Sequence, residues 1–510
     1  MTPKLIQSLK GYKKSDLWHD LTAGLMVAII ALPLSIALGL QSVPAEVSSR
    51  GIQFGVITAI VAGFFISALG GSKHQIGGPT AAFVVILFGY LANPDIGVLG
   101  LALAGIMAGG ILIVMGLLRA GSVMKFFPYP ITIGFTTGIG VTLLIGQIKD
   151  LCGLNAGGVD AIEKIVSYII NISSFDLATF GVGVLGLLCV ILLPKVSKKI
   201  PAAFVALIVC TGATLLFNLL GANVTTIGSK YGDIQAGFFP IDFSTIAQVK
   251  FSALIMPAIV IAFLCAIESL LSATVAAGMT GVPFDANQEL VGQGAANICS
   301  SLLGGLPATG AIARTAAAIE HGAKSPLAGM FHAVFVLIMY FALMNVVKYI
   351  PLAVFSAILI SVAINMSRFP LFFKLAKFGV RDTVILLITC LLTIVFDLTY
   401  GVIGGVAVTF VLNAKNLKTG LKIDRTENTF TLSGALFFLN ANKLVDTLRE
   451  VLTDYHELVV DMTNLESIDE TALEKLVGLQ RFAKKQNTAL RFVGCNEKTE
   501  KRITKYETVL

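Results

Sequence analysis

Long apolar runs separated by short polar loops fill the chain up to about residue 414. Twelve of these runs are long enough to cross a bilayer as helices. They lie at roughly 22–41, 52–70, 97–118, 129–148, 175–194, 200–221, 252–275, 288–304, 326–346, 351–366, 382–397 and 400–414. Two further apolar stretches, 75–91 and 304–319, are short and rich in Gly and Pro, so neither spans as a regular helix. The pattern predicts a polytopic α-helical membrane protein.

The two interrupted stretches occupy matching places in the chain. Each is the third crossing of a set of seven, and Pro79 and Pro307 each open a half-helix of small residues. Because seven is an odd number, the second set must enter the membrane inverted relative to the first. We therefore expect 14 transmembrane segments in a 7+7 inverted repeat, with repeats at about 21–221 and 250–415 of a transport domain at 21–415. Interrupted helices at equivalent positions of an inverted repeat are typical of secondary transporters with a midplane site.

The pattern differs before and after this domain. Residues 1–20 predict a cytoplasmic amphipathic segment, and from about 424 strands alternate with amphipathic helices, which predicts a small α/β domain over 424–510. Residues 1–414 carry 22 Lys and Arg with 16 Asp and Glu, whereas the last 96 residues carry 15 and 14. Only 13% of the whole chain is charged, against roughly 25% in soluble domains. This excludes an ordinary soluble enzyme and a disordered protein.

The charges in the loops predict the orientation of the chain. With a cytoplasmic N-terminus, the cytoplasmic segments up to residue 382 hold fifteen Lys and Arg, and the outer segments hold six. This positive-inside bias places both termini in the cytoplasm and indicates the plasma membrane, which is the inner membrane of a bacterium. The same bias explains the net charge of +7, so this charge does not indicate nucleic-acid binding. The seven cysteines lack metal-ligand spacing, and no Ser-His-Asp set or phosphate loop is present, so we expect no structural metal and no enzyme.

The starts of the two half-helices are the candidate anion site. The first N–H groups of a helix have no acceptor within it and carry the positive end of its dipole. Gly78, Pro79, Pro307 and Gly310 suit such starts, because proline has no N–H to satisfy and glycine permits close approach of a ligand. Two N-termini that meet end to end would bind an anion without a metal. The alternative is a Gly/Pro kink between tightly packed helices.

Two isolated charges accompany these starts. Glu268 is the only charged residue within 252–283, and Arg314 is the only one within 291–318. Charges inside a membrane face a partner or a water-filled cavity. We expect Arg314 to strengthen the anion site, and Glu268 to tune it or carry a coupling proton, with Ser272 on the same helical face. A structural Glu268–Arg314 pair is the alternative, and the two hypotheses overlap.

Two threonines each have two interpretations. Thr80 follows Pro79 directly, so its hydroxyl either contacts a substrate oxygen or caps its own half-helix. Thr471 lies in the sequence SIDETA at a predicted strand–helix turn. A residue there is either a helix cap or, for Thr471, a phosphorylation site.

Several motifs, in order along the chain, resemble the SulP sulfate permease family, also called solute carrier family twenty-six. They are DLTAGLMVAIIALPLSIALG, QIGGPTAAF, AIESLLSA and NQELVGQGAANICSSLLGGLPATGAIARTA. The tail is similar to the STAS domain that closes those proteins, through LVVDMTNLESIDETALEKL. The resemblance covers nearly the whole chain. In its motifs the chain is most similar to the bicarbonate-transporting branch of the family.

This resemblance implies a core domain and a gate domain, an elevator-like movement and a homodimer. It places the coupling acidic residue on Glu268 and the substrate contacts on Thr80, Ala81, Ala311, Ile312 and Arg314. The chain also departs from the family. Pro33-Leu34 replaces the Pro-Gln of many sulfate carriers. Glu268 and Ser272 stand at the positions where the bicarbonate branch has the Asp and Thr of a sodium site. Ala472 replaces the glycine that usually follows the phosphorylatable position.

Together these observations predict secondary active transport of a small anion, bicarbonate or sulfate, by symport or anion exchange. The coupling ion would be Na⁺ or H⁺, with no other cofactor. A dicarboxylate (fumarate or succinate) proton symporter is the alternative, followed by a nucleobase permease of the same fold and an anion channel. The expected partners are the anion, membrane lipid, a second copy of the chain and a cytosolic protein bound by the STAS domain.

Overall fold

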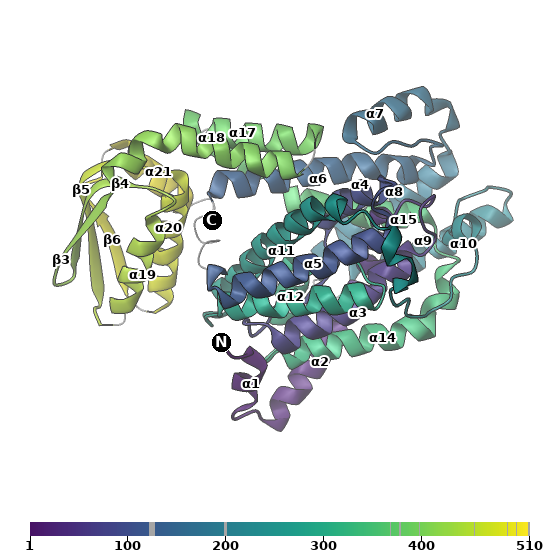
Figure 1. The fold of residues 1–510 in the computed structure, drawn as a ribbon, viewed down its shortest axis with the longest axis horizontal. Helices are drawn as coiled ribbons and strands as arrows, with labels where there is room; N and C mark the ends of the chain where they lie inside the picture. The colour runs from purple at the N-terminus through teal and green to yellow at the C-terminus, as the bar shows by residue number, and fades with distance from the viewer. Residues whose placement is uncertain are drawn as a thin grey trace. The chain divides into compact units, whose positions relative to one another are not determined.

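The computed structural model describes residues 1–121, 128–197, 201–367, 369–376, 379–396, 398–452, 454–486, 488–495 and 497–507 (Figure 1). The chain forms two compact units. The first comprises Met1–Met124 with Ile139–Met366, and the second comprises Lys125–Gly138 with Ser367–Leu510. Among the loop cations counted for the orientation, Lys125, Lys198, Lys199, Arg368 and Lys377 lie outside the described residues.

Each apolar run expected from the sequence contains a helix. The first half of the chain forms α1 (Lys4–Leu9), α2 (Lys14–Ser42), α3 (Gly51–Leu69), α4 (Ala81–Ala92), α5 (Gly97–Leu117), α6 (Tyr129–Cys152), α7 (Ala161–Ile170), α8 (Leu177–Val196), α9 (Ala202–Leu219) and α10 (Ile227–Tyr231). The second half adds α11 (Phe251–Thr280), α12 (Ala286–Leu302), α13 (Ile312–Glu320), α14 (Leu327–Val347), α15 (Leu352–Ser367), α16 (Phe369–Leu375), α17 (Val380–Val395) and α18 (Leu398–Thr419). Among the described residues, 9 helices are long and apolar enough to cross a membrane. The membrane fold is as predicted, and the count of fourteen crossings stays a prediction.

The helices of the first unit pack closely where glycines face one another. Gly39 of α2 and Gly55 of α3 are so close that a Cβ on either would collide with the backbone of the other helix. Gly109 of α5 and Gly294 of α12 form the same kind of contact. Small residues allow such backbone approach between helices in lipid. Helices α2, α3, α5, α12 and α14 pack side by side as one bundle (Figure 1).

The two interrupted segments meet in a two-stranded antiparallel sheet. Strand β1 (Gly77–Gly78) pairs with β2 (Thr309–Gly310), so that Gly77 lies opposite Gly310 and Gly78 opposite Thr309. Glycine is required here for space: a Cβ on Gly310 would overlap the side chain of Gln75, and one on Gly78 would overlap Arg314. Gly78 also has a φ of 149°, which side chains with a Cβ rarely adopt. The first and second repeats are therefore joined at the interrupted helices.

The second unit contains a four-stranded sheet in the order β3-β4-β5-β6. Its elements are β3 (Leu421–Thr426), β4 (Thr429–Leu436), α19 (Ala441–Val451), β5 (Glu457–Ile468), α20 (Glu470–Lys485), β6 (Ala489–Val493) and α21 (Glu497–Glu507). Strands β3 and β4 are antiparallel, and the other neighbours are parallel. Leu, Val and Ala side chains of α19 and α20 pack with those of β4 and β5, which gives the small α/β domain expected for the tail.

Candidate functional site

The half-helices begin later than the prolines suggested. Helix α4 starts at Ala81 after the N-cap Thr80, and α13 starts at Ile312 after the N-cap Ala311. Gly78 and Gly310 lie in the short sheet instead, and Pro307 lies before β2, so the expected start at Pro307 is corrected to Ile312. The reason is the pairing of β1 with β2, which takes up the residues before each helix.

The first turns of α4 and α13 provide donors for an anion. The N–H groups of a helix's first turn have no acceptor within the helix. Neither the Thr80 side chain nor the Ala311 side chain caps its helix. Thr80, Ala311 and Ile312 are half-buried, whereas Ala81 is buried. Two helix N-termini therefore begin beside a shared two-stranded sheet, each with its positive dipole end and partly accessible backbone.

Arg314 binds the backbone between the half-helices. Its side chain is only 1% exposed. Nη1 donates to the carbonyl oxygen of Gly77 at 3.2 Å, and Nη2 donates to the carbonyl of Pro79 at 3.3 Å and to Ser35 Oγ at 3.1 Å. The guanidinium thus joins α13 to β1, to the start of α4 and to α2. It places a positive charge behind the N-terminus of α4 while its terminal nitrogens bind protein acceptors.

Glu268 pairs with Thr80 rather than with Arg314. Thr80 Oγ1 donates to Glu268 Oε2 at 3.0 Å, and Glu268 is half-buried on α11. Within the described part of the chain, no carboxylate lies within ion-pair distance of Arg314, so the structural Glu268–Arg314 pair is absent there. The structure therefore brings Thr80 and Glu268 together, a contact that the spacing of the sequence did not indicate.

Ser272 takes part in a different contact from Glu268. It is fully buried, and its Oγ lies 3.4 Å from Thr315 Oγ1. Thr315 Oγ1 in turn accepts the backbone N–H of Ile76 at 3.1 Å. Ser272 therefore helps to hold α13 against the segment that leads to β1, one helical turn beyond the carboxylate of Glu268.

Polar residues that the sequence interpretation overlooked hold the second interrupted segment. Asn297 on α12 forms a paired bond with Ala308: its Nδ2 donates to the Ala308 carbonyl at 2.9 Å, and its Oδ1 accepts the Ala308 N–H at 2.8 Å. Ser269 Oγ lies 2.7 Å from Thr309 Oγ1 and accepts the N–H of Gly310 at 3.3 Å. Their signal was present as buried polar residues on membrane helices, which need a hydrogen-bond partner.

Glu289 is a buried carboxylate that the sequence analysis did not single out. It is fully buried on α12, and its Oε2 accepts the backbone N–H groups of Gly71 at 2.9 Å and Ser72 at 3.0 Å. Gln293 donates to Oε1 at 2.8 Å. These three neutral donors fix the loop after α3, which precedes β1. Glu289 thus supports the position of the first half-helix from a distance.

Thr471 is buried at the start of α20. Asp469 is the N-cap of this helix: Oδ1 accepts the N–H of Ala472 at 2.8 Å, and Oδ2 accepts that of Phe438 at 2.8 Å. Burial raises the pKa of Asp469 to about 6, although both N–H donors act in the opposite direction. Thr471 Oγ1 accepts the N–H of Tyr129, at the start of α6, at 2.9 Å. Whether Thr471 is phosphorylated stays a prediction, and the residue is 2% exposed.

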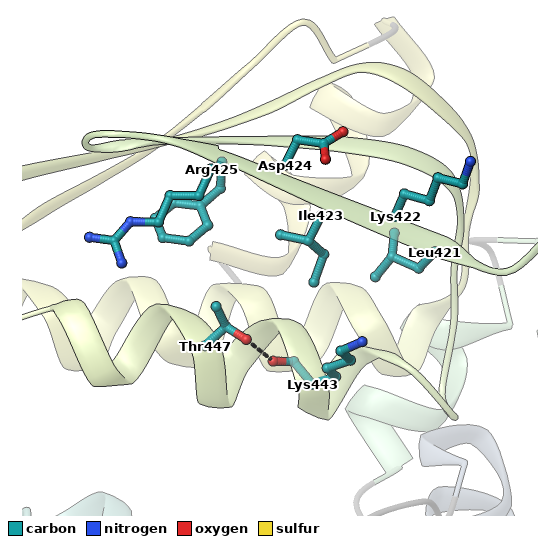
Figure 2. A pocket seen from close by; sticks show the side chains of 8 residues that line it. Leu421, Lys422, Ile423, Asp424, Arg425, Lys443 and Thr447 are labelled. Atoms are coloured by element: carbon teal, nitrogen blue, oxygen red, sulfur yellow. Dashed lines mark hydrogen bonds between the residues drawn. The ribbon is translucent and has the colours of Figure 1, made fainter.

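The tail domain also contains an open pocket of about 460 Å³ between β3 and α19. It is lined by Leu421, Lys422, Ile423, Asp424, Arg425, Phe430, Lys443 and Thr447. Figure 2 shows that the side chains of Leu421 and Ile423 point toward α19, whereas Lys422 and Asp424 point away from it. The floor of the pocket is thus apolar, and Arg425 and Lys443 supply positive charge near it.

Comparisons with known proteins bear on the family and the fold. The putative sulfate transporter YvdB of Bacillus subtilis is 35% identical over 97% of this chain and 95% of that protein. The bicarbonate transporter BicA of Picosynechococcus sp. is 27% identical over 95% of this chain and 90% of that protein. The transmembrane domain of a cyanobacterial BicA superposes with a TM-score of 0.69 at 28% identity, covering 77% of this chain and 98% of that one.

A more distant structure has the same fold. The murine solute carrier 26 family member A9 anion transporter superposes with a TM-score of 0.70 at 17% identity, over 99% of this chain and 90% of that one. Residues 17–389 match the sulfate permease family, and residues 421–508 match the STAS domain. With that match over most of its length, and with a relative at 35% identity across 97% of it, this chain belongs to the sulfate permease family of membrane transporters, which are not enzymes.

Proposed function

We propose that this protein is a secondary active transporter of a small inorganic anion, with bicarbonate and sulfate as the substrates to test first. The observation that carries the proposal is the meeting of the α4 and α13 N-termini beside the buried Arg314 charge. Backbone N–H donors and helix dipoles favour an anion there. Relatives named as sulfate and bicarbonate transporters support these two substrates.

The Thr80–Glu268 contact is the proposed coupling element. A carboxylate beside the anion site repels a bound anion. A cation that neutralises Glu268, either H⁺ or Na⁺, would remove this repulsion. Loss of the Thr80–Glu268 hydrogen bond would also release the Thr80 hydroxyl to donate to the substrate. Substrate and coupling ion would then bind cooperatively, which is the requirement for symport.

The substrate and the coupling ion are tested by one uptake screen. Purified protein in liposomes is assayed with labelled bicarbonate, sulfate and fumarate, under an inward Na⁺ gradient, a pH step or a counter-anion gradient. We expect gradient-driven accumulation of bicarbonate or sulfate. Accumulation of fumarate alone would favour the dicarboxylate symporter, and a flux far above carrier turnover would favour a channel. The absence of flux for every anion under all three gradients would refute the proposal.

The role of Glu268 is tested with a matched carboxylate. Glu268→Gln should bind anion without a bound cation, so uptake should lose its dependence on the Na⁺ gradient or the pH step. Glu289→Gln is the control, because Glu289 is also a membrane carboxylate but contacts the loop after α3 instead of Thr80. If Glu268→Gln keeps full coupling, the coupling ion binds elsewhere.

The core, which consists of α2–α5 and α11–α14, is proposed to move as one body in an elevator-like manner. The β1–β2 sheet and the Arg314 contacts join its two repeats. We place the protein in the plasma membrane with both termini in the cytoplasm, and as a homodimer. Protease protection of an N-terminal tag in sealed inverted vesicles would contradict this orientation, and a monomer mass in lipid nanodiscs would contradict the dimer.

We also propose that the STAS domain binds a cytosolic protein at the pocket between β3 and α19. The apolar floor of this pocket, with Arg425 and Lys443 beside it, favours an acidic partner (Figure 2). Arg425→Glu and Lys443→Glu should each abolish cross-linking to the partner in cells. Lys484→Glu is the matched control, since Lys484 is exposed on α20 and does not line this pocket. Equal cross-linking in all three variants would place the partner elsewhere.

A further inference from the structure

Helix α7 carries an apolar stripe that stays exposed. It is 10 residues long and lies in the connection between α6 and α8 (Figure 1). The exposed side chains are Ile162 at 53%, Ile165 at 42%, Val166 at 49%, Ile169 at 69% and Ile170 at 71%. Their spacing is i, i+3, i+4, i+7 and i+8, which places them on one helical face. An isoleucine-rich face of this kind is unusual on a water-exposed loop.

A second face of α7 packs on the protein. Ala161 and Tyr168 are buried, and the Tyr168 hydroxyl donates to the carbonyl oxygen of Ile145 on α6 at 3.0 Å. Tyr168 also packs with Leu154 and Ala156 in a small apolar cluster. The orientation of α7 is therefore fixed relative to the end of α6, and the apolar stripe is not the face used for this packing.

A third face of α7 is polar. Glu163 Oε2 accepts the N–H of Val159 at 2.9 Å, and Ser167 Oγ accepts the N–H of Gly157 at 3.0 Å. At about 100° per residue, Glu163 and Ser167 lie along one edge of the apolar stripe, and Tyr168 lies along its other edge. The helix thus has a protein face, an apolar face and a polar face, as expected where protein, lipid and water meet.

The length of α7 and its neighbours indicate what covers the stripe. A helix of this size is about 15 Å long, too short for a hydrocarbon core of about 30 Å. The apolar surface continues along the chain through Ile172, which is 62% exposed, to Leu177 at the start of α8, which is 75% exposed. Helix α8 is apolar enough to span the membrane. Its exposed apolar side chains are therefore covered by lipid, and α8 begins only seven residues after the stripe of α7 ends.

We propose that α7 is an interfacial helix that lies in the plane of the membrane surface at which α6 ends. Its isoleucine stripe enters the boundary between phospholipid headgroups and acyl chains. The Glu163 edge stays in water, and Tyr168 holds the helix against α6. The phospholipid bilayer itself covers the stripe. This inference goes beyond the proposed function, because it requires only that the chain resides in a membrane.

Fluorescence quenching in lipid tests the proposal. The chain has one tryptophan, so Trp18→Phe gives a background without native signal. Ile169→Trp and Ile165→Trp each place a reporter on the stripe, and Glu163→Trp is the matched control on the polar face. Each protein is reconstituted into phosphatidylcholine vesicles whose acyl chains carry bromine either near the headgroup or near the chain end. Unchanged size-exclusion profiles show that the variants fold, and the second stripe position serves if one does not.

The expected result is a blue-shifted emission at both stripe positions, with most of the signal lost to shallow bromine and much less to deep bromine. The control should be quenched by aqueous acrylamide and little affected by either lipid. Quenching of the stripe reporters by acrylamide alone would overturn the proposal by placing the stripe in water. Protection from both lipid and acrylamide would also overturn it, in favour of a second copy of the chain. Equal quenching by deep and shallow bromine would rule out an in-plane helix.

Discussion

The contribution of Arg314 separates into charge and hydrogen bonding, and two substitutions distinguish them. Arg314→Met removes the charge and all three donors to Gly77, Pro79 and Ser35. Arg314→Lys keeps the charge but loses the planar fork that reaches these acceptors together. If the anion binds at the half-helix starts, a separation of about 6–8 Å and an effective dielectric constant of about 20 give the charge about 2–3 kcal/mol of binding free energy. This corresponds to roughly 30- to 100-fold in Kd.

The two variants should therefore differ in binding and agree in stability. We expect Arg314→Met to raise the Kd of the transported anion by roughly 30- to 100-fold, and Arg314→Lys to raise it by only a few-fold. Both should lower the melting temperature, because each leaves buried acceptors without the donors they now have. The assay is equilibrium binding of labelled anion to purified protein, with thermal unfolding in the absence of anion as the stability measurement.

Two results would refute this reasoning. An unchanged Kd in Arg314→Met, together with a lower melting temperature, would reduce Arg314 to a purely structural contact. An equal loss of affinity in both variants would show that the geometry of the β1–α4 backbone, not the electrostatic field, determines binding. Ser35→Ala is the matched control. It removes one acceptor of the guanidinium and leaves the charge in place.

Substitutions at three other residues, Glu289, His74 and Thr471, test buried polar groups. Glu289→Gln keeps one oxygen that can accept both loop N–H groups but loses the acceptor of Gln293, so it should lower the melting temperature slightly. Glu289→Ala should cost about 2–4 kcal/mol of unfolding free energy, because it leaves the loop N–H groups unpaired. His74 lies between α3 and β1 and is buried. Burial lowers its pKa to about 4, so the folded state resists the protonation that the unfolded state accepts below about pH 6.5. Between pH 6.5 and 4 the wild type should lose up to about 3 kcal/mol of stability relative to His74→Gln, and parallel pH curves would contradict this. Thr471→Glu, which buries a charge beside the Tyr129 N–H, should lower the melting temperature more than Thr471→Val; equal values would show that the site is open to solvent.

The sequence predicts the membrane helices well, because a bilayer requires continuous apolar runs of a set length. All fourteen apolar segments contain a helix in the structure. The short helices α4 and α13 lie within the two interrupted stretches, at their apolar ends. Their starting residues were less predictable. Pairing between Gly77 and Gly310 determines where each helix can begin, and that contact joins two distant parts of the chain.

The candidate site shows the same division between local and distant information. Isolation in apolar sequence singled out Glu268 and Arg314, and in the structure they contact Thr80 and Pro79 before α4. Their roles in anion binding and coupling stay predictions. Their partners, Thr80 and Ser35, lie on other helices. Helical spacing relates residues on one helix only, so it grouped Ser272 with Glu268 and gave no information about Thr80.

The β1–β2 sheet has a consequence for how the protein is made. Its first strand leaves the ribosome long before its second, because Gly77 and Gly310 belong to different repeats. Until the second strand is synthesised, the glycine backbone of β1 has no partner strand, and the carbonyls of Gly77 and Pro79 lack the Arg314 donors. Unpaired backbone groups are costly in hydrocarbon. The first repeat should therefore stay near the insertion machinery as an unfinished intermediate, and truncation before residue 310 should leave a chain that quality-control proteases degrade.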